Sequence, residues 1–103
     1  MSDPHRMTLR PPWEKEALPD GRTRHHRRFG RPRTVDDHET VWLVGEASGE
    51  VLLNGELLGA CDGRFAFEVT HRLSPRNEVA VDTAGEPGPV AVEVRATPPP
   101  AGP

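Results

Sequence analysis

The sequence predicts an all-β fold, an antiparallel β-sandwich with flexible, proline-rich termini, from three observations. From residue 24 onward, apolar residues recur at every second position, which is the period of a strand with one buried face. Turn-forming glycine pairs such as Asn54-Gly55 separate these runs. The sequence also lacks the i, i+3, i+4 apolar stripe of a long helix. The one helix candidate is a short turn over residues 13–18, between two prolines.

The segment 41–53 is expected to form a β-hairpin. A three-residue loop over 47–49 would place Gly49 in the left-handed conformation, which glycine adopts without steric cost. This register sets Leu43 opposite Leu53, so that both strands send their apolar residues to one side. Further turns are predicted at Asn54-Gly55, Asp62-Gly63, 74–77 and 86–89.

The alternating pattern also identifies the residues that should face the core. Each buried side chain of this size contributes roughly 1.5–3 kcal/mol. The predicted core residues are Phe29, Val41, Leu43, Val51, Leu53, Phe65, Phe67, Val69, Leu73, Val79, Val81, Val90, Val92 and Val94.

Length and composition indicate one domain with distinct ends. A chain of 103 residues can build a single core. Residues 1–23 are interpreted as an N-terminal extension, partly disordered or packed on the sandwich, and residues 24–96 as the β-sandwich domain. Residues 97–103 are predicted to be a disordered tail because four of the seven are proline.

Charge is divided unevenly along the chain, although the net charge is only -3. Residues 1–33 hold nine Arg or Lys against four acids, and residues 34–103 hold four against twelve. The arginines from Arg22 to Arg33 fall in a predicted strand. We therefore expect them to lie at a strand edge and to pair with the acidic residues of 34–103 rather than with phosphate. Accordingly, we expect no nucleic-acid partner.

Cysteine content and hydropathy bear on the cellular setting. The single Cys61 excludes an internal disulfide. No apolar run approaches the roughly 20 residues of a membrane-spanning helix, and the first ten residues lack the apolar stretch of a signal peptide. These features predict a cytoplasmic protein with no membrane partner.

Few residues are candidates for chemistry. The acids and histidine of 36–39 match no metal-binding spacing and are expected to form a solvated loop. His25 and His26 are adjacent, so on a strand they face opposite sides and do not readily share a metal. Nothing near Cys61 in the sequence provides a base to activate its thiol. We therefore predict no metal, no cofactor and no catalytic residue, that is, a protein that is not an enzyme.

Several motifs nevertheless resemble a known family, over about residues 24–96. The most specific is a strand, the turn Leu53-Asn54-Gly55, a second strand and then Gly59. With the runs 27–32, 39–43, 65–70 and 77–81, it resembles the galactose-binding-like jelly-roll domain at the front of family 2 glycoside hydrolases. The resemblance implies a jelly roll with an accessory sugar-binding role. It implies no hydrolase activity, because the catalytic acids of those enzymes lie in a separate barrel domain.

In the expected hairpin register, three apolar side chains point away from the core: Trp42, Val44 and Leu52. Such a patch on a sheet surface needs a covering group. The candidates are Trp13 or Leu18 of the N-terminal segment, another domain or subunit, and a sugar stacked on the indole ring.

Two functions follow from this face. A non-catalytic carbohydrate-binding module would use Trp42 together with Asp62 and Arg64. The alternative is a protein-protein interaction or structural module with no sugar affinity, which would use the patch of Trp42, Val44 and Leu52. Its partner would be a protein domain such as a glycoside hydrolase, or a second copy of the chain. Fold analogy favours the first function, and the low aromatic content favours the second.

Overall fold

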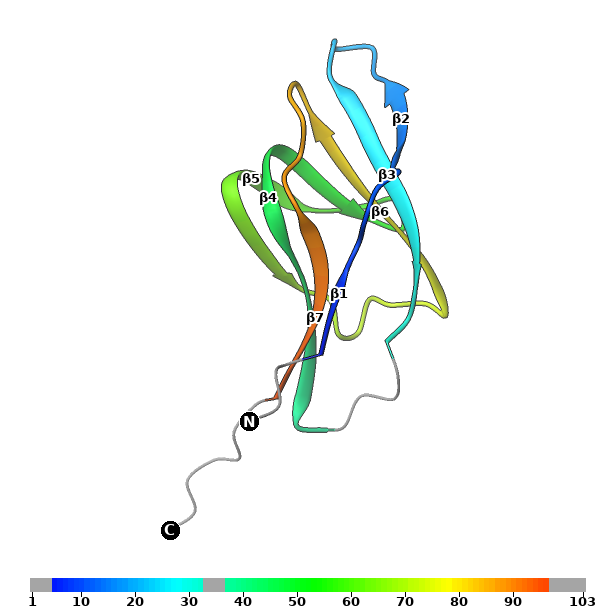
Figure 1. Ribbon diagram of the computed structural model, residues 1–103, viewed down its shortest axis with the longest axis vertical. Helices are drawn as coiled ribbons and strands as arrows, with labels where there is room; N and C mark the ends of the chain where they lie inside the picture. Colours follow the sequence, from blue (N-terminus) through cyan, green and yellow to red (C-terminus); the bar gives the residue numbers. More distant parts are fainter. Residues whose placement is uncertain (1–4, 33–36, 97–103) are drawn as a thin grey trace.

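The computed structural model describes residues 5–32 and 37–96, and in them the predicted all-β class is confirmed. No helix is present in this part of the chain, and hence none long and apolar enough to cross a membrane. All strand pairs are antiparallel. The strands are β1 (His5–Thr8), β2 (Glu14–Ala17), β3 (Thr23–Gly30), β4 (Glu39–Leu53), β5 (Glu56–Glu68), β6 (Arg76–Thr83) and β7 (Val90–Ala96) (Figure 1).

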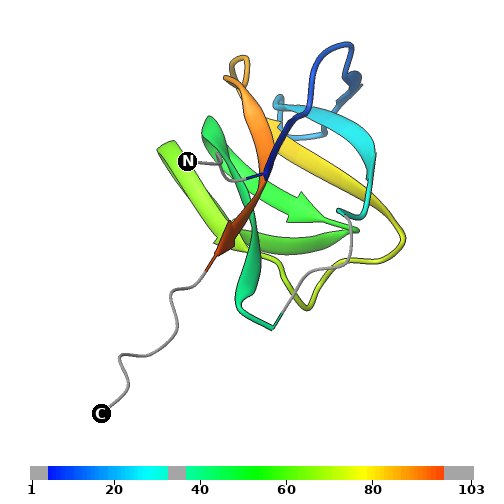
Figure 2. The ribbon, with the colours of Figure 1, turned by 60° about the horizontal axis from the view of Figure 1, so that its bottom comes forward.

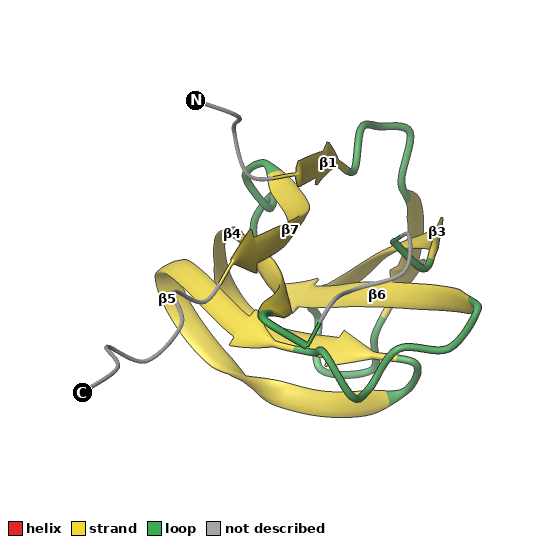
Figure 3. Ribbon diagram, turned by 90° about the horizontal axis from the view of Figure 1, so that it is seen from below, coloured by secondary structure: helices red, strands yellow, loops and turns green. Residues whose placement is uncertain are grey.

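The strands form one curled sheet. Its order is β1-β7-β4-β6-β3-β2, and β5 pairs with the other side of β4. The two ends of this order, β1 and β2, are consecutive in the chain and are joined by residues 9–13 alone. The sheet therefore curls round its own apolar face, and Figure 3 shows the strands wrapped about that interior. The helix candidate at 13–18 was wrong, because this segment contains β2, which pairs with β3.

β4 is continuous over fifteen residues, so the predicted hairpin at 47–49 is wrong. Its first half, Glu39 to Gly45, pairs with β7, and its last part, Gly49 to Leu53, pairs with β6. β5 follows the opposite side of β4 along most of its length. Leu43 consequently lies opposite Phe67 rather than Leu53. Figure 2 shows the bend of β4 between its two partners.

The true reversal of the chain is at Asn54-Gly55, where a turn was predicted. Both residues have positive φ, 52° for Asn54 and 84° for Gly55, which is typical of the tight turn that joins two twisted strands. The second predicted turn, Asp62-Gly63, is wrong. Both residues continue β5, with Gly63 at a φ of 115°.

The core lies on the inner face of the curled sheet. All of the predicted core residues belong to it or pack against it, with Phe67, Leu73 and Val94 only partly buried. Leu9 and Ala47 join them, and neither was predicted. The agreement is close although the hairpin was wrong, because alternation along one strand decides which side chains share a face whatever the strand pairs with.

Three of the four arginines between residues 22 and 28 pair with acids of the later part of the chain, as predicted. The fourth, Arg27, donates to the backbone oxygens of Arg10 and Arg28. Arg24 makes two hydrogen bonds to the buried carboxylate of Asp82, at 2.7 and 2.9 Å. Arg22 contacts Glu50, and Arg28 contacts Glu78. Their expected place at a sheet edge is wrong, because β3 lies between β2 and β6.

The two predicted terminal segments differ in how much of each the structure describes. The tail at 97–103 lies outside them. The extension at 1–23 contributes β1 and β2 to the sheet, and also Leu9, which is 3% exposed.

We predict that Gly49→Ala lowers the free energy of unfolding by about 2–3 kcal/mol, measured by urea denaturation. A Cβ atom at Gly49 would lie 1.9 Å from the backbone oxygen of Asp82 on β6, so β4 and β6 would have to separate. Gly30→Ala is the control, because a Cβ atom there meets nothing within 4 Å. Equal losses in the two variants would contradict the close packing of β4 on β6.

Candidate functional site

The candidate site lies on the outer face of the sheet, where β4, β5 and β7 run side by side. Val41 and Leu43 are buried in the core, so the residues between and after them point outward. The register aligns Val44 with Ala66 of β5 and Ala91 of β7. The neighbouring rows carry Glu46 with Arg64, and Trp42 with Glu68 and Glu93.

A hollow of about 610 Å³ opens on this face, and we call it the outer hollow. Its apolar floor is formed by Val44, Gly45, Phe65, Ala66 and Pro89. On one side stands the pair Arg64 and Glu46, with 3.5 Å between Nε and Oε1. The other side is formed by the charged residues Arg6, Glu93 and Arg95.

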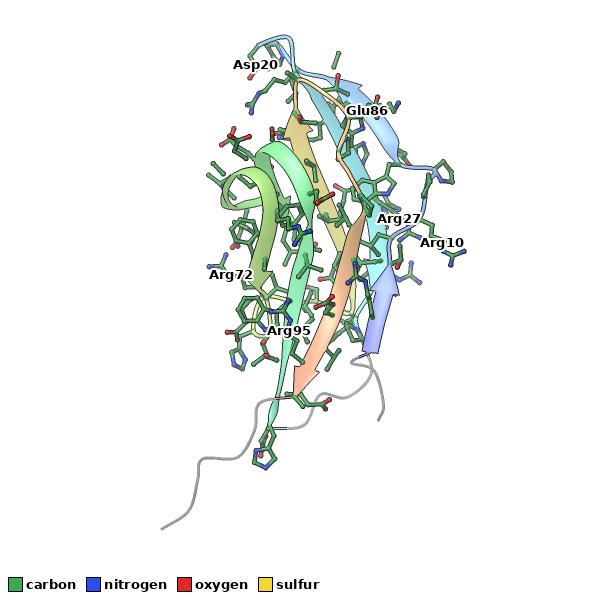
Figure 4. The ribbon with its side chains drawn as sticks, turned by 60° about the vertical axis from the view of Figure 1, so that its left-hand side comes forward. Arg10, Asp20, Arg27, Arg72, Glu86 and Arg95 are labelled. Carbon is green, nitrogen blue, oxygen red and sulfur yellow. The ribbon has the colours of Figure 1, made fainter. Side chains whose placement is uncertain are left out.

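The charges on this second side hold one another in place. The carboxylate of Glu93 accepts hydrogen bonds from both Arg6 and Arg95, the latter at 3.1 Å. The guanidinium carbon of Arg95 also lies 4.7 Å from the centre of the Trp42 ring, which is a cation–π contact (Figure 4 labels Arg95). Trp42 in turn donates from its indole nitrogen to Thr40. The hydrogen-bonding groups of this side are therefore oriented before any ligand arrives.

The structure separates the residues predicted to bind sugar. Arg64 lines the outer hollow, and Trp42 borders it through Arg95. Asp62 lies outside the lining and accepts a hydrogen bond of 2.9 Å from Ser48.

The apolar patch predicted from Trp42, Val44 and Leu52 is not contiguous. Val44 is only 8% exposed. Leu52 belongs to the other part of β4, opposite Leu57 and Ala80. The group stacked on Trp42 is Arg95, whereas Trp13 packs against the core and donates to the Leu9 backbone oxygen at 3.0 Å.

Sequence reasoning missed Arg6, Glu93 and Arg95. The alternation of Val92, Glu93, Val94 and Arg95 did indicate that the two charged residues share the outer face of a strand. Their position beside Trp42 depends on the pairing of β7 with β4, and the sequence pattern does not specify that pairing.

The described residues hold no group of three or more His, Cys, Asp or Glu side chains placed to bind a metal. Asp36, one of the acids predicted to form a solvated loop, lies outside the described residues. Burial raises the pKa of the Cys61 thiol, and the charge of Asp62 adds to the effect, while a hydrogen bond with the Gly49 backbone acts in the opposite direction. A raised pKa leaves less thiolate at neutral pH.

A scan against protein-family models and a search of curated proteins found no match to this chain.

We predict that Cys61 reacts with iodoacetamide at pH 8 several-fold more slowly than N-acetylcysteinamide, an uncharged model of an ordinary cysteine, because its raised pKa and partial burial reduce the reactive thiolate. Mass spectrometry of timed samples gives the rate, and the protein unfolded in urea is the control, since its thiol is released from these effects. A folded protein that reacts as fast as the free thiol would contradict the assignment.

Proposed function

We propose that this protein is a non-catalytic carbohydrate-binding module and that the sugar occupies the outer hollow. The observation that supports the proposal best is the combination of an apolar floor with paired arginine and glutamate side chains on both sides. With it goes the finer fold assignment of a galactose-binding-like jelly roll, which the antiparallel curled sheet and the motifs around Asn54-Gly55 support.

A pyranose presents two kinds of surface, and the outer hollow offers a counterpart for each. Its C–H groups suit an apolar floor such as Val44 and Ala66. Its hydroxyls both donate and accept hydrogen bonds. Arginine supplies only donors and glutamate only acceptors, so a neighbouring pair such as Arg64 and Glu46 can bind adjacent hydroxyls.

The mixture of charges favours a neutral ligand. Arg6, Arg64 and Arg95 stand against Glu46 and Glu93, so an anion would meet carboxylates on both sides of the outer hollow. Arg6 and Arg95 are, moreover, already paired with Glu93.

Docking of a protein on this face has less support. A stable interface buries about 800 Å² on each partner and usually has an apolar centre. Here the apolar floor is recessed, and Val44 is nearly covered. The exposed large apolar side chains among the described residues are Met7 and Leu57, and neither lines the outer hollow.

The proposal predicts that a glycan array detects a neutral glycan ligand, and that methyl galactoside or methyl glucoside titrates the protein with a millimolar or tighter Kd. Arg64→Ala and Trp42→Ala should each weaken binding about tenfold, the loss expected from one charge-assisted hydrogen bond. Arg64 provides such a bond directly, and Trp42 holds Arg95 in position.

Arg72→Ala is the matched control, because Arg72 is an exposed arginine outside the outer hollow (Figure 4). It should bind as the unchanged protein does. An array with no bound glycan, together with dimerisation that depends on concentration in sedimentation experiments, would overturn the proposal and favour the interaction module. Equal losses in Arg64→Ala and Arg72→Ala would show that the outer hollow is not the site.

A further inference from the structure

A second cavity, of about 580 Å³, lies between the segment that joins β1 to β2 and the loop that joins β6 to β7, and its lining shares only Pro89 with that of the outer hollow. We call it the tryptophan cavity. Its lining is mainly apolar. Trp13 and Leu9 come from the segment between β1 and β2, and Pro87 and Pro89 come from the loop between β6 and β7. Arg10 and Glu86, labelled in Figure 4, belong to the same two segments and also line the cavity.

His25 is the buried polar group of this cavity. Its place in β3 is opposite Val81, which is opposite Val51 on β4, so its ring points inward with these fully buried valines. The residue is 2% exposed, and it lines the tryptophan cavity. His26 points to the other face, near Glu78, as the adjacency of the two histidines predicted.

Among the buried polar residues of the described chain, His25 alone lacks a side-chain hydrogen bond. Asn77 bonds to Ser74, Asp82 to Arg24, and Thr83 to the backbone of Ser48. No hydrogen bond joins the His25 ring to another described residue. Yet no described side-chain nitrogen or oxygen that is fully sealed from solvent lacks a partner. The unpaired ring nitrogens of His25 are therefore not fully sealed, and the cavity that the residue lines gives them access.

A ligand that covers these nitrogens must bring a hydrogen bond of its own, because a buried polar group left without a partner carries a free-energy penalty. The ligand must bring an apolar body for Trp13 and the prolines, and one polar group for His25. A sugar is a poor match, because the side chains of Trp13, Leu9 and the prolines offer no partners to the hydroxyls that would lie against them. A phenol matches, because its ring is flat and apolar and its single hydroxyl both donates and accepts hydrogen bonds, as an imidazole also does.

We propose that the tryptophan cavity binds a phenol ring, with the hydroxyl hydrogen-bonded to His25 and the ring against Trp13. The mouth carries an ion pair of 3.5 Å between Lys15 and Glu86, and both side chains are well exposed, so they can separate to admit a ligand. The ring does not come from a second copy of this chain, because the sequence contains no tyrosine. The proposal does not rest on sugar binding, because neither Trp13 nor His25 lines the outer hollow and the two linings share only Pro89.

The test compares p-cresol with toluene, which has the same ring and methyl group but no hydroxyl. Binding is followed by the fluorescence of Trp13 in a Trp42→Phe background, where it is the only remaining tryptophan. We expect p-cresol to bind about fivefold more tightly than toluene, the ratio that one neutral hydrogen bond gives. The proposal would be overturned if toluene bound as tightly as p-cresol or more tightly. It would also be overturned if p-cresol did not bind at concentrations up to 20 mM, which is roughly the weakest binding expected of so small a ligand.

His25→Leu should abolish this preference, whereas the matched variant His26→Leu should keep it because His26 faces away from the cavity. Equal effects of the two substitutions would contradict the role of His25. If His25→Leu fails to fold, the comparison of p-cresol with toluene in the parent protein still decides the matter.

The same assay with N-acetyltyrosinamide and 4-hydroxyphenylacetate identifies the source of the phenol. Tighter binding of the first indicates a tyrosine side chain of another protein. Tighter binding of the second indicates a small phenolic acid whose carboxylate meets Lys15 and Arg10 at the rim. Failure of both to bind, when p-cresol binds, would overturn the phenol as the natural ligand.

Discussion

The contact between the bend of β4 and the end of β6 is the constraint on which this fold depends. It requires a residue without a side chain at Gly49, where the Asp82 backbone oxygen would lie 1.9 Å from a Cβ atom. Gly45 has a similar role beside the Pro89 oxygen, at 2.7 Å. Between the two glycines, the backbone of Glu46 exchanges hydrogen bonds with Gly88 and Pro89 of the loop that joins β6 to β7. Because these groups approach so closely, one strand can pair with β7 and then with β6 and so curl the sheet.

Both proposed sites follow from this arrangement, and Pro89 lines both of them. The first half of β4 pairs with β7, which brings Glu93 and Arg95 beside Trp42 and forms one side of the outer hollow. The last part of β4 pairs with β6, and through β6 it aligns His25 with buried valines on the inner face. The loop between β6 and β7, which contacts the bend, also forms a wall of the tryptophan cavity.

Local patterns predicted the strand faces and one turn, and failed wherever a distant segment decided the outcome. The alternation of Val41 and Leu43, or of Val79 and Val81, identifies core residues whatever the strands pair with. Asn54-Gly55 forms its own turn, because both residues tolerate positive φ. Gly49 was interpreted as a loop glycine for the same reason, but it is needed because β6 packs against it. In the candidate sites too, local patterns identified some residues and distant strand pairing decided the others. Trp42 and Arg64 were found from one strand each, whereas Arg6, Glu93 and His25 acquire their roles only from the pairing of β7 with β1 and β4, and of β3 with β6.

The most direct test of a continuous β4 is the set of nuclear Overhauser contacts made by the methyl groups of Leu43. A continuous strand paired with β5 predicts strong contacts from Leu43 to the ring of Phe67 and to Val92 on the other neighbouring strand. A hairpin at residues 47–49 would instead place Leu43 opposite Leu53. Contacts between Leu43 and Leu53 in place of those to Phe67 would contradict the continuous strand, and with it the geometry of both sites.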